Sequence, residues 1–139
     1  MKDIYFACSI RGGREDANKY ADLVNHIKIK ANVLTEIFAD KKLTSQGMNL
    51  PNEEIWQRDM NWIKQADAVI AEVSSPSLGV GYEIAKAEEL RKPILALYQN
   101  DDTHKLSAMI AGSKDGTLAV NYTKLEEAKQ EIDDFISRL

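Results

Sequence analysis

The sequence has few of the features that mark several large classes of protein. Its 139 residues include a single cysteine, Cys8, so no disulfide can form within the chain, which is typical of a reducing compartment. No apolar run approaches the roughly 20 residues that span a bilayer. The apolar start of the chain is short and leads into a glycine-rich polar stretch, unlike a signal peptide. We therefore expect a cytoplasmic protein without membrane contact.

Basic charge and metal-binding residues are also scarce. Lys and Arg number 18 against 22 Asp and Glu, the net charge is −4, and no basic run appears. A general nucleic-acid binder would need a basic face, so we expect no nucleic-acid partner. His26 and His104 are the only histidines, and together with Cys8 they show no metal-ligand spacing. We expect no metal site and no Ser-His-Asp hydrolase.

What the sequence does contain predicts one α/β domain over residues 1–139. Short apolar runs alternate with longer amphipathic stretches, which favours a doubly wound, five-stranded parallel sheet of the Rossmann or flavodoxin-like type. The expected strands cover 4–8, 32–35, 68–73, 94–98 and 118–121. The expected helices cover 14–30, 51–66, 81–91, 106–111 and 124–139.

In such sheets ligands bind beyond the carboxyl ends of the strands, and the segment SIRGGR at 9–14 lies there after the first strand. Its glycines let the backbone approach a ligand, and the N–H groups that open a helix favour an anion. Ser9 and Arg11 can add bonds to a phosphate. A tight strand-to-helix turn explains the segment equally well. It matches neither a P-loop nor the dinucleotide pattern, so nothing indicates ATP or NAD.

The segment SSPSLGVGYE at 74–83 occupies the same position after the third strand. Ser77 and nearby amides are suited to a second phosphate oxygen. Glu83 falls in the predicted first turn of a helix, where the macrodipole stabilises a carboxylate. An ionised carboxylate is what attack on a sugar C1′ requires. The alternative is an ordinary first-turn glutamate.

Asp59 is the third candidate, because it lies in an otherwise apolar stripe of the helix expected at 51–66. A buried carboxylate is costly unless it is paired or functional, and a neighbouring Arg or Lys is the plain alternative. Taken alone, Tyr5 fits a core tyrosine, and Ser107 and Met109 fit ordinary loop or helix structure. Two anion-friendly segments near two carboxylates together suit phosphate-anchored cleavage at an anomeric carbon.

Longer stretches of the sequence resemble the 2′-deoxynucleoside 5′-phosphate N-hydrolases of the nucleoside 2-deoxyribosyltransferase superfamily. The matching segments are IYFACSIRGGRED at 4–16, VLTE at 33–36, WQRDMNWIKQADAVIAEVSSPSLGVGYE at 56–83 and KLSAMIAGSKDG at 105–116. The resemblance implies hydrolysis of 2′-deoxynucleoside 5′-monophosphates (dNMPs) to a free base and 2-deoxyribose 5-phosphate, without a cofactor. It makes Glu83 the nucleophile that forms a glycosyl-enzyme, Asp59 the acid that orients it or assists the base, and Tyr5 a residue that shapes its environment.

The resemblance also implies how the substrate phosphate is held. The positions that match the phosphate contacts are Ser9, Ile10, Arg11, Gly12, Gly13, Ser77 and Gly79. Ser107 and Met109 match residues that reach the neighbouring subunit's ligand, which implies a homodimer with shared sites. One position departs from the family: relatives often carry a histidine directly after the Thr-Glu of the second strand, where this chain has Ile37. The sequence therefore does not decide which base is preferred. The loop at 38–50 also differs from that of relatives, and we expect it to border the base pocket.

Three other functions remain open at this stage. A deoxyribosyltransferase would use a second base in place of water, and a ribonucleotide N-glycosidase of the CMP type would share the fold and the glutamate. A nucleotide-binding module without turnover would keep Arg11 and Ser77 but would have no need of both Asp59 and Glu83. The phosphate segments favour monophosphates over free nucleosides.

Overall fold

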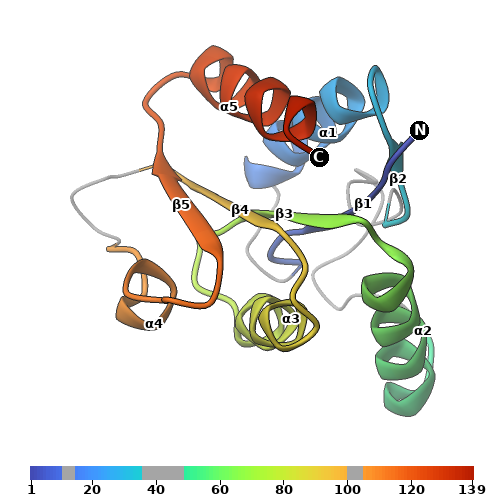
Figure 1. The fold of residues 1–139 in the computed structure, drawn as a ribbon. Coiled ribbons are helices and arrows are strands. Elements are labelled where there is room, and N and C mark those ends of the chain that lie inside the picture. The colour runs from blue at the N-terminus through green and yellow to red at the C-terminus, as the bar shows by residue number, and fades with distance from the viewer. Residues whose placement is uncertain (11–14, 36–48, 100–104) are drawn as a thin grey trace.

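The computed structural model describes residues 1–10, 15–35, 49–99 and 105–139. A five-stranded parallel sheet forms its centre, in the order β2-β1-β3-β4-β5 (Figure 1). The strands are β1 (Asp3–Ala7), β2 (Asn32–Val33), β3 (Ala68–Glu72), β4 (Ile94–Tyr98) and β5 (Thr117–Asn121). The helices are α1 (Glu15–Lys28), α2 (Asn52–Gln65), α3 (Leu78–Glu89), α4 (Ala108–Ala111) and α5 (Leu125–Ser137). The predicted doubly wound α/β fold is confirmed.

Helices cover both faces of the sheet, with α1 and α5 on one side and α2 and α3 on the other (Figure 1). The inner strands β1, β3 and β4 are buried on both faces, which explains their nearly unbroken apolar runs. Successive side chains of β1 point to opposite faces. Phe6 packs edge-on against Tyr20 of α1, whereas Tyr5 reaches Glu83 of α3. Strand order reverses between β1 and β3, so the segments that follow these two strands lie at the switch point.

The second strand is shorter than predicted, because β2 ends at Val33 instead of residue 35. At Thr35 the side-chain hydroxyl, instead of the backbone, makes the hydrogen bonds to β1. Its hydroxyl accepts a hydrogen bond from the Phe6 N–H at 2.8 Å and donates one to the Phe6 carbonyl at 2.7 Å. The β1 backbone is therefore satisfied although the neighbouring chain has left the sheet.

Helix α3 begins three residues before the predicted start at 81. The Ser77 hydroxyl accepts a hydrogen bond from the Val80 N–H at 3.3 Å and caps the helix. Gly79 and Gly81, which suggested a turn, lie inside the first helical turns. The other differences are small: α1 ends at residue 28 instead of 30, and α4 covers 108–111 instead of 106–111. Within the described ranges, no helix has the length and apolar character that crossing a membrane requires.

Candidate active site

Two carboxyl groups and a tyrosine gather between α2, α3 and β1. Tyr5 is fully buried in β1, and its hydroxyl donates a hydrogen bond to Oε2 of Glu83. Asp59 of α2 is close enough for its negative charge to raise the pKa of both groups. The structure thus brings together the three residues that were predicted to be catalytic, from three separate elements.

Asp59 does not stand alone on α2. Arg58 contacts its Oδ1 through Nη2 and Nε, both at 2.9 Å, and the two side chains are 20% and 14% exposed. The Arg58 guanidinium also lies over the Trp62 ring, 4.8 Å from its centre. Burial raises the pKa of Asp59, and the Arg58 contact partly offsets that rise. Asp59 is therefore paired with a neighbouring arginine, as the alternative explanation for its burial required, and this ion pair lies close to Glu83.

Burial dominates the ionisation of Glu83 and raises its pKa from 4.5 to about 7. The hydrogen bond from Tyr5 lowers the pKa of Glu83, Asp59 raises it, and Arg58 lowers it. The same surroundings raise the pKa of the Tyr5 hydroxyl, first by burial and then by the two carboxylates. Tyr5 therefore acts as a hydrogen-bond donor, and Glu83 can exchange a proton near neutral pH.

The prediction that the helix dipole holds Glu83 as an anion in the first turn is wrong. Because α3 begins at Leu78, Glu83 lies in the second turn, where the dipole effect has fallen away. Burial works in the opposite direction and favours the protonated form. The Tyr5 hydrogen bond opposes this effect most strongly, and the charge of Arg58 adds to that opposition.

Ser77 and Gly79 lie beside the Glu83 carboxylate. A Cβ placed on Gly79 would meet Oε1 of Glu83 and Oγ of Ser77, each at 3.9 Å. Any longer side chain at this position would fill the space between the hydroxyl and the carboxylate. The oxygen of Glu83 that lies nearest to Gly79 is Oε1, the one that Tyr5 does not contact.

The first predicted phosphate segment is described only in part. Ser9 is buried directly after β1, and Ile10 packs against the core. Arg11, Gly12 and Gly13 lie outside the described residues, as do Ile37 and most of the loop at 38–50. The segments that follow β1 and β3 start at adjacent strands of the sheet, as predicted.

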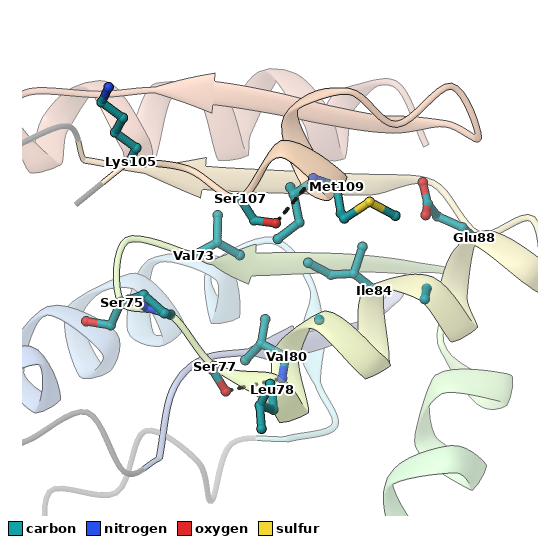
Figure 2. A pocket seen from close by; sticks show the side chains of 14 residues that line it. Val73, Ser75, Ser77, Leu78, Val80, Ile84, Glu88, Lys105, Ser107 and Met109 are labelled. Carbon is teal, nitrogen blue, oxygen red and sulfur yellow. Dashed lines mark hydrogen bonds between the residues drawn. The ribbon is translucent and has the colours of Figure 1, made fainter.

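A groove of about 600 Å³ runs along the opposite flank of α3, between that helix and α4. Figure 2 shows Ser77 and Leu78 on one side of it and Ser107 and Met109 on the other. The Ser107 hydroxyl caps α4 by accepting the Met109 N–H at 3.2 Å. Leu78 and Met109 are 98% and 84% exposed. This groove is mainly apolar and excludes Glu83, Asp59 and Tyr5, so it is separate from the acid cluster and meets it only through Ser77.

Sequence reasoning missed several polar residues that the fold brings together. Arg58 was not singled out, although its position directly before Asp59 was a visible signal. Glu72 was not singled out either; it interrupts the apolar run of β3, but its partners come from distant elements. Within the described ranges, no three His, Cys, Asp or Glu side chains gather closely enough to hold a metal ion.

Comparison with known proteins shows the family to which the chain belongs. The family model described as nucleoside 2-deoxyribosyltransferase matches residues 4–134. The chain belongs to this family. It is 42% identical over 137 residues to the 5-hydroxymethyl-dUMP N-hydrolase of Rattus norvegicus, covering 97% of this chain and 82% of that protein. It is 39% identical over 137 residues to the protein of the same name from Tetraodon nigroviridis, covering 96% of each.

Solved structures agree with this nucleoside 2-deoxyribosyltransferase fold. A CMP N-glycosidase from Clostridium botulinum superposes with a TM-score of 0.70 at 20% identity, covering 95% of this chain and 99% of that one. This likeness concerns the fold alone. Together with the N-hydrolases above, family membership confirms the prediction of an enzyme that cleaves N-glycosidic bonds.

Proposed function

We propose that this family member hydrolyses the N-glycosidic bond of 2′-deoxynucleoside 5′-monophosphates, with Glu83 as the nucleophile. The observation that carries the proposal is the cluster of Tyr5, Glu83 and Asp59, in which a carboxyl group with a pKa of about 7 lies next to Gly79. Perturbed carboxyl pairs of this kind are typical of glycosidic bond cleavage. The N-hydrolases that share about two fifths of the sequence support the substrate class.

The two oxygens of Glu83 have different roles in this mechanism. Tyr5 binds Oε2, which fixes the carboxylate and favours its ionised form. Oε1 faces Gly79 and attacks C1′ of the deoxyribose as the C1′–N bond breaks. The leaving base takes the bonding electron pair, and a proton from Asp59 or from water neutralises it. The product of this step is a glycosyl ester on Glu83.

Water completes the reaction by attacking C1′ of this ester. The C1′–O bond to Glu83 breaks, the carboxylate is regenerated, and the attacking water gives one proton to Asp59 or to solvent as 2-deoxyribose 5-phosphate leaves. The transition states carry positive charge at C1′, so the missing 2′-hydroxyl helps, because that group withdraws electrons. The 5′-phosphate is held by Ser77 and by the segment from Ser9 to Gly13, which anchors the sugar beside Glu83.

We further propose that the enzyme is a homodimer in which the partner supplies Ser107 and Met109 to the phosphate end of the site. Leu78 and Met109 are almost fully exposed apolar side chains on opposite sides of the groove between α3 and α4. Exposed apolar side chains that gather around a groove are typical of an interface. Ser77 lines both this groove and the space beside Glu83, so a second copy seated here would border the phosphate site.

Chromatographic product analysis tests the proposed reaction. The purified protein and its Glu83→Ala variant are incubated with a panel of dNMPs that includes 5-hydroxymethyl-dUMP, with ribonucleoside monophosphates, and with free deoxynucleosides. We expect free base from dNMPs with the wild type alone. Release from ribonucleotides only would move the activity to the CMP type, and base exchange between free deoxynucleosides would indicate a transferase. Binding without turnover of any substrate would contradict the proposal.

A further inference from the structure

A second buried carboxylate lies on the opposite face of the sheet from Glu83. Glu72 ends β3 and is fully buried. Its Oε1 accepts the Ser74 N–H at 2.7 Å, its Oε2 accepts the Tyr122 hydroxyl, and the Lys19 Nζ lies 3.6 Å from Oε2. A buried carboxylate is tolerated when it is paired and hydrogen-bonded in this way. Glu72 therefore anchors the first residues of the segment that leaves β3.

Lys19 of α1 links Glu72 to a second acid, Asp16, which lies on α1 as well. Its Nζ lies 3.8 Å from Oδ1 of Asp16, in the first turn of α1. The other oxygen of Asp16, Oδ2, accepts the Ser75 hydroxyl at 2.9 Å. One ammonium group thus serves two carboxylates, and these hold Ser74 and Ser75, which are consecutive residues of one segment.

A third contact fixes this segment from the side of β4. The Ser74 hydroxyl accepts the backbone N–H of Gln99 at 2.8 Å. Two residues beyond Ser75, the Ser77 hydroxyl caps α3 and lies next to the space beside Glu83. Val73 still pairs with β4 through its N–H, which the Leu97 carbonyl accepts at 2.8 Å, but residues 74–77 belong to no helix or strand. The course of residues 74–77 is therefore set by side chains of α1 and β3 and by the backbone just beyond β4.

We propose that Asp16, held by Lys19, is a positioning residue for the phosphate end of the substrate site. Its hydrogen bond from Ser75 ties α1 to the segment that carries Ser77, and so fixes where that hydroxyl meets the 5′-phosphate. Hydroxyl and backbone donors bind phosphate only when their direction is maintained, so loss of this tie weakens phosphate binding more than chemistry at C1′. Lys19 balances the negative charge of Asp16, which would otherwise repel the phosphate. This inference rests on the proposed function.

Kinetics of the Ser75→Ala, Asp16→Ala and double variants test this role. KM for the dNMP that the wild type cleaves fastest should rise roughly fivefold to tenfold in each single variant, since one oriented hydrogen bond is lost. The inhibition constant of inorganic phosphate should rise by the same factor, and kcat should stay within about twofold of the wild type. The double variant should match Asp16→Ala, because Asp16→Ala has already removed the partner of the Ser75 hydroxyl.

The matched control is Gln130→Ala, which removes a side-chain hydrogen bond to Asp134 of 3.0 Å on α5, away from this network. It should leave KM, the phosphate inhibition constant and kcat unchanged, while melting curves show that every variant is folded. Unchanged constants in an active Ser75→Ala enzyme, or additive effects in the double variant, would overturn the positioning role alone. Wild-type protein that releases no base from any dNMP would sink the proposed function and the positioning role with it.

Discussion

Removing the Tyr5 hydroxyl tests how the site controls the charge of its nucleophile. Tyr5→Phe keeps the buried ring and deletes the hydrogen bond to Glu83, a contact that lowers the pKa of that carboxyl group. A hydrogen bond to a charged group contributes about 1.5–3 kcal/mol, and one pKa unit corresponds to about 1.4 kcal/mol. The pKa of Glu83 should therefore rise by about one to two units from its value of about 7.

The consequence is a loss of activity that alkaline pH restores. Glu83 acts as a carboxylate, so kcat/KM of the wild type should increase as the pH rises through about 7. In Tyr5→Phe the ionised fraction at pH 7 falls from about one half to between roughly 1% and 10%, so kcat/KM drops about fivefold to fiftyfold. Near pH 10 the variant should approach the wild-type rate.

Initial rates of base release from one dNMP between pH 5 and pH 10 measure this effect. The second pKa of the substrate phosphate, about 6, affects wild type and variant equally. Tyr98→Phe on β4 is the control, and its acid limb should coincide with that of the wild type. An acid limb that stays in place in Tyr5→Phe would refute the role of the hydrogen bond. A wild-type rate that falls as pH rises through 7 would make Glu83 a general acid instead of a nucleophile.

Three further predictions follow from the same contacts. The pKa of Glu83 is higher in the folded protein than its ordinary 4.5, so folding stability falls as pH rises from about 4.5 to 7. Glu83→Gln should therefore raise the free energy of unfolding at pH 8 by up to about 3 kcal/mol. The same variant should leave the free energy of unfolding unchanged at pH 4, and urea titrations at the two pH values measure both effects. Asp59→Asn should lower kcat about a hundredfold and move the acid limb to lower pH, because a neighbouring negative charge is lost; an acid limb that moves upward would contradict this. Leu78→Glu should turn the proposed dimer into a monomer in analytical ultracentrifugation while the circular dichroism spectrum is retained, and a wild type that sediments as a monomer would exclude the dimer.

The fold could be predicted because its signals are local and repeated. The β4 strand matches the prediction at both ends, and the apolar face of α1 is buried as expected. Errors arose where one side chain overrides a local tendency. Thr35 satisfies β1 with its hydroxyl and lets the chain leave the sheet early. Ser77 caps a helix that two glycines seemed to exclude.

The sequence predicted which residues form the acid cluster but not how they ionise. That Tyr5, Asp59 and Glu83 meet follows from the sheet order, but the direction of the Glu83 pKa shift depends on burial, which no spacing reveals. The network around Glu72 was out of reach for a different reason. Its members lie on α1, on β3 and just beyond β5, and their contacts exist only once three distant segments are packed together.

The anomeric configuration of the product shows whether Glu83 forms a covalent bond to the sugar. When a dNMP is cleaved in water containing methanol, a glycosyl-enzyme on Glu83 should transfer the sugar to methanol with retention. NMR should identify the β-methyl glycoside of 2-deoxyribose 5-phosphate with the wild type, and Glu83→Gln should form none. The α-anomer would mean that water or methanol displaces the base directly, and it would contradict Glu83 as the nucleophile.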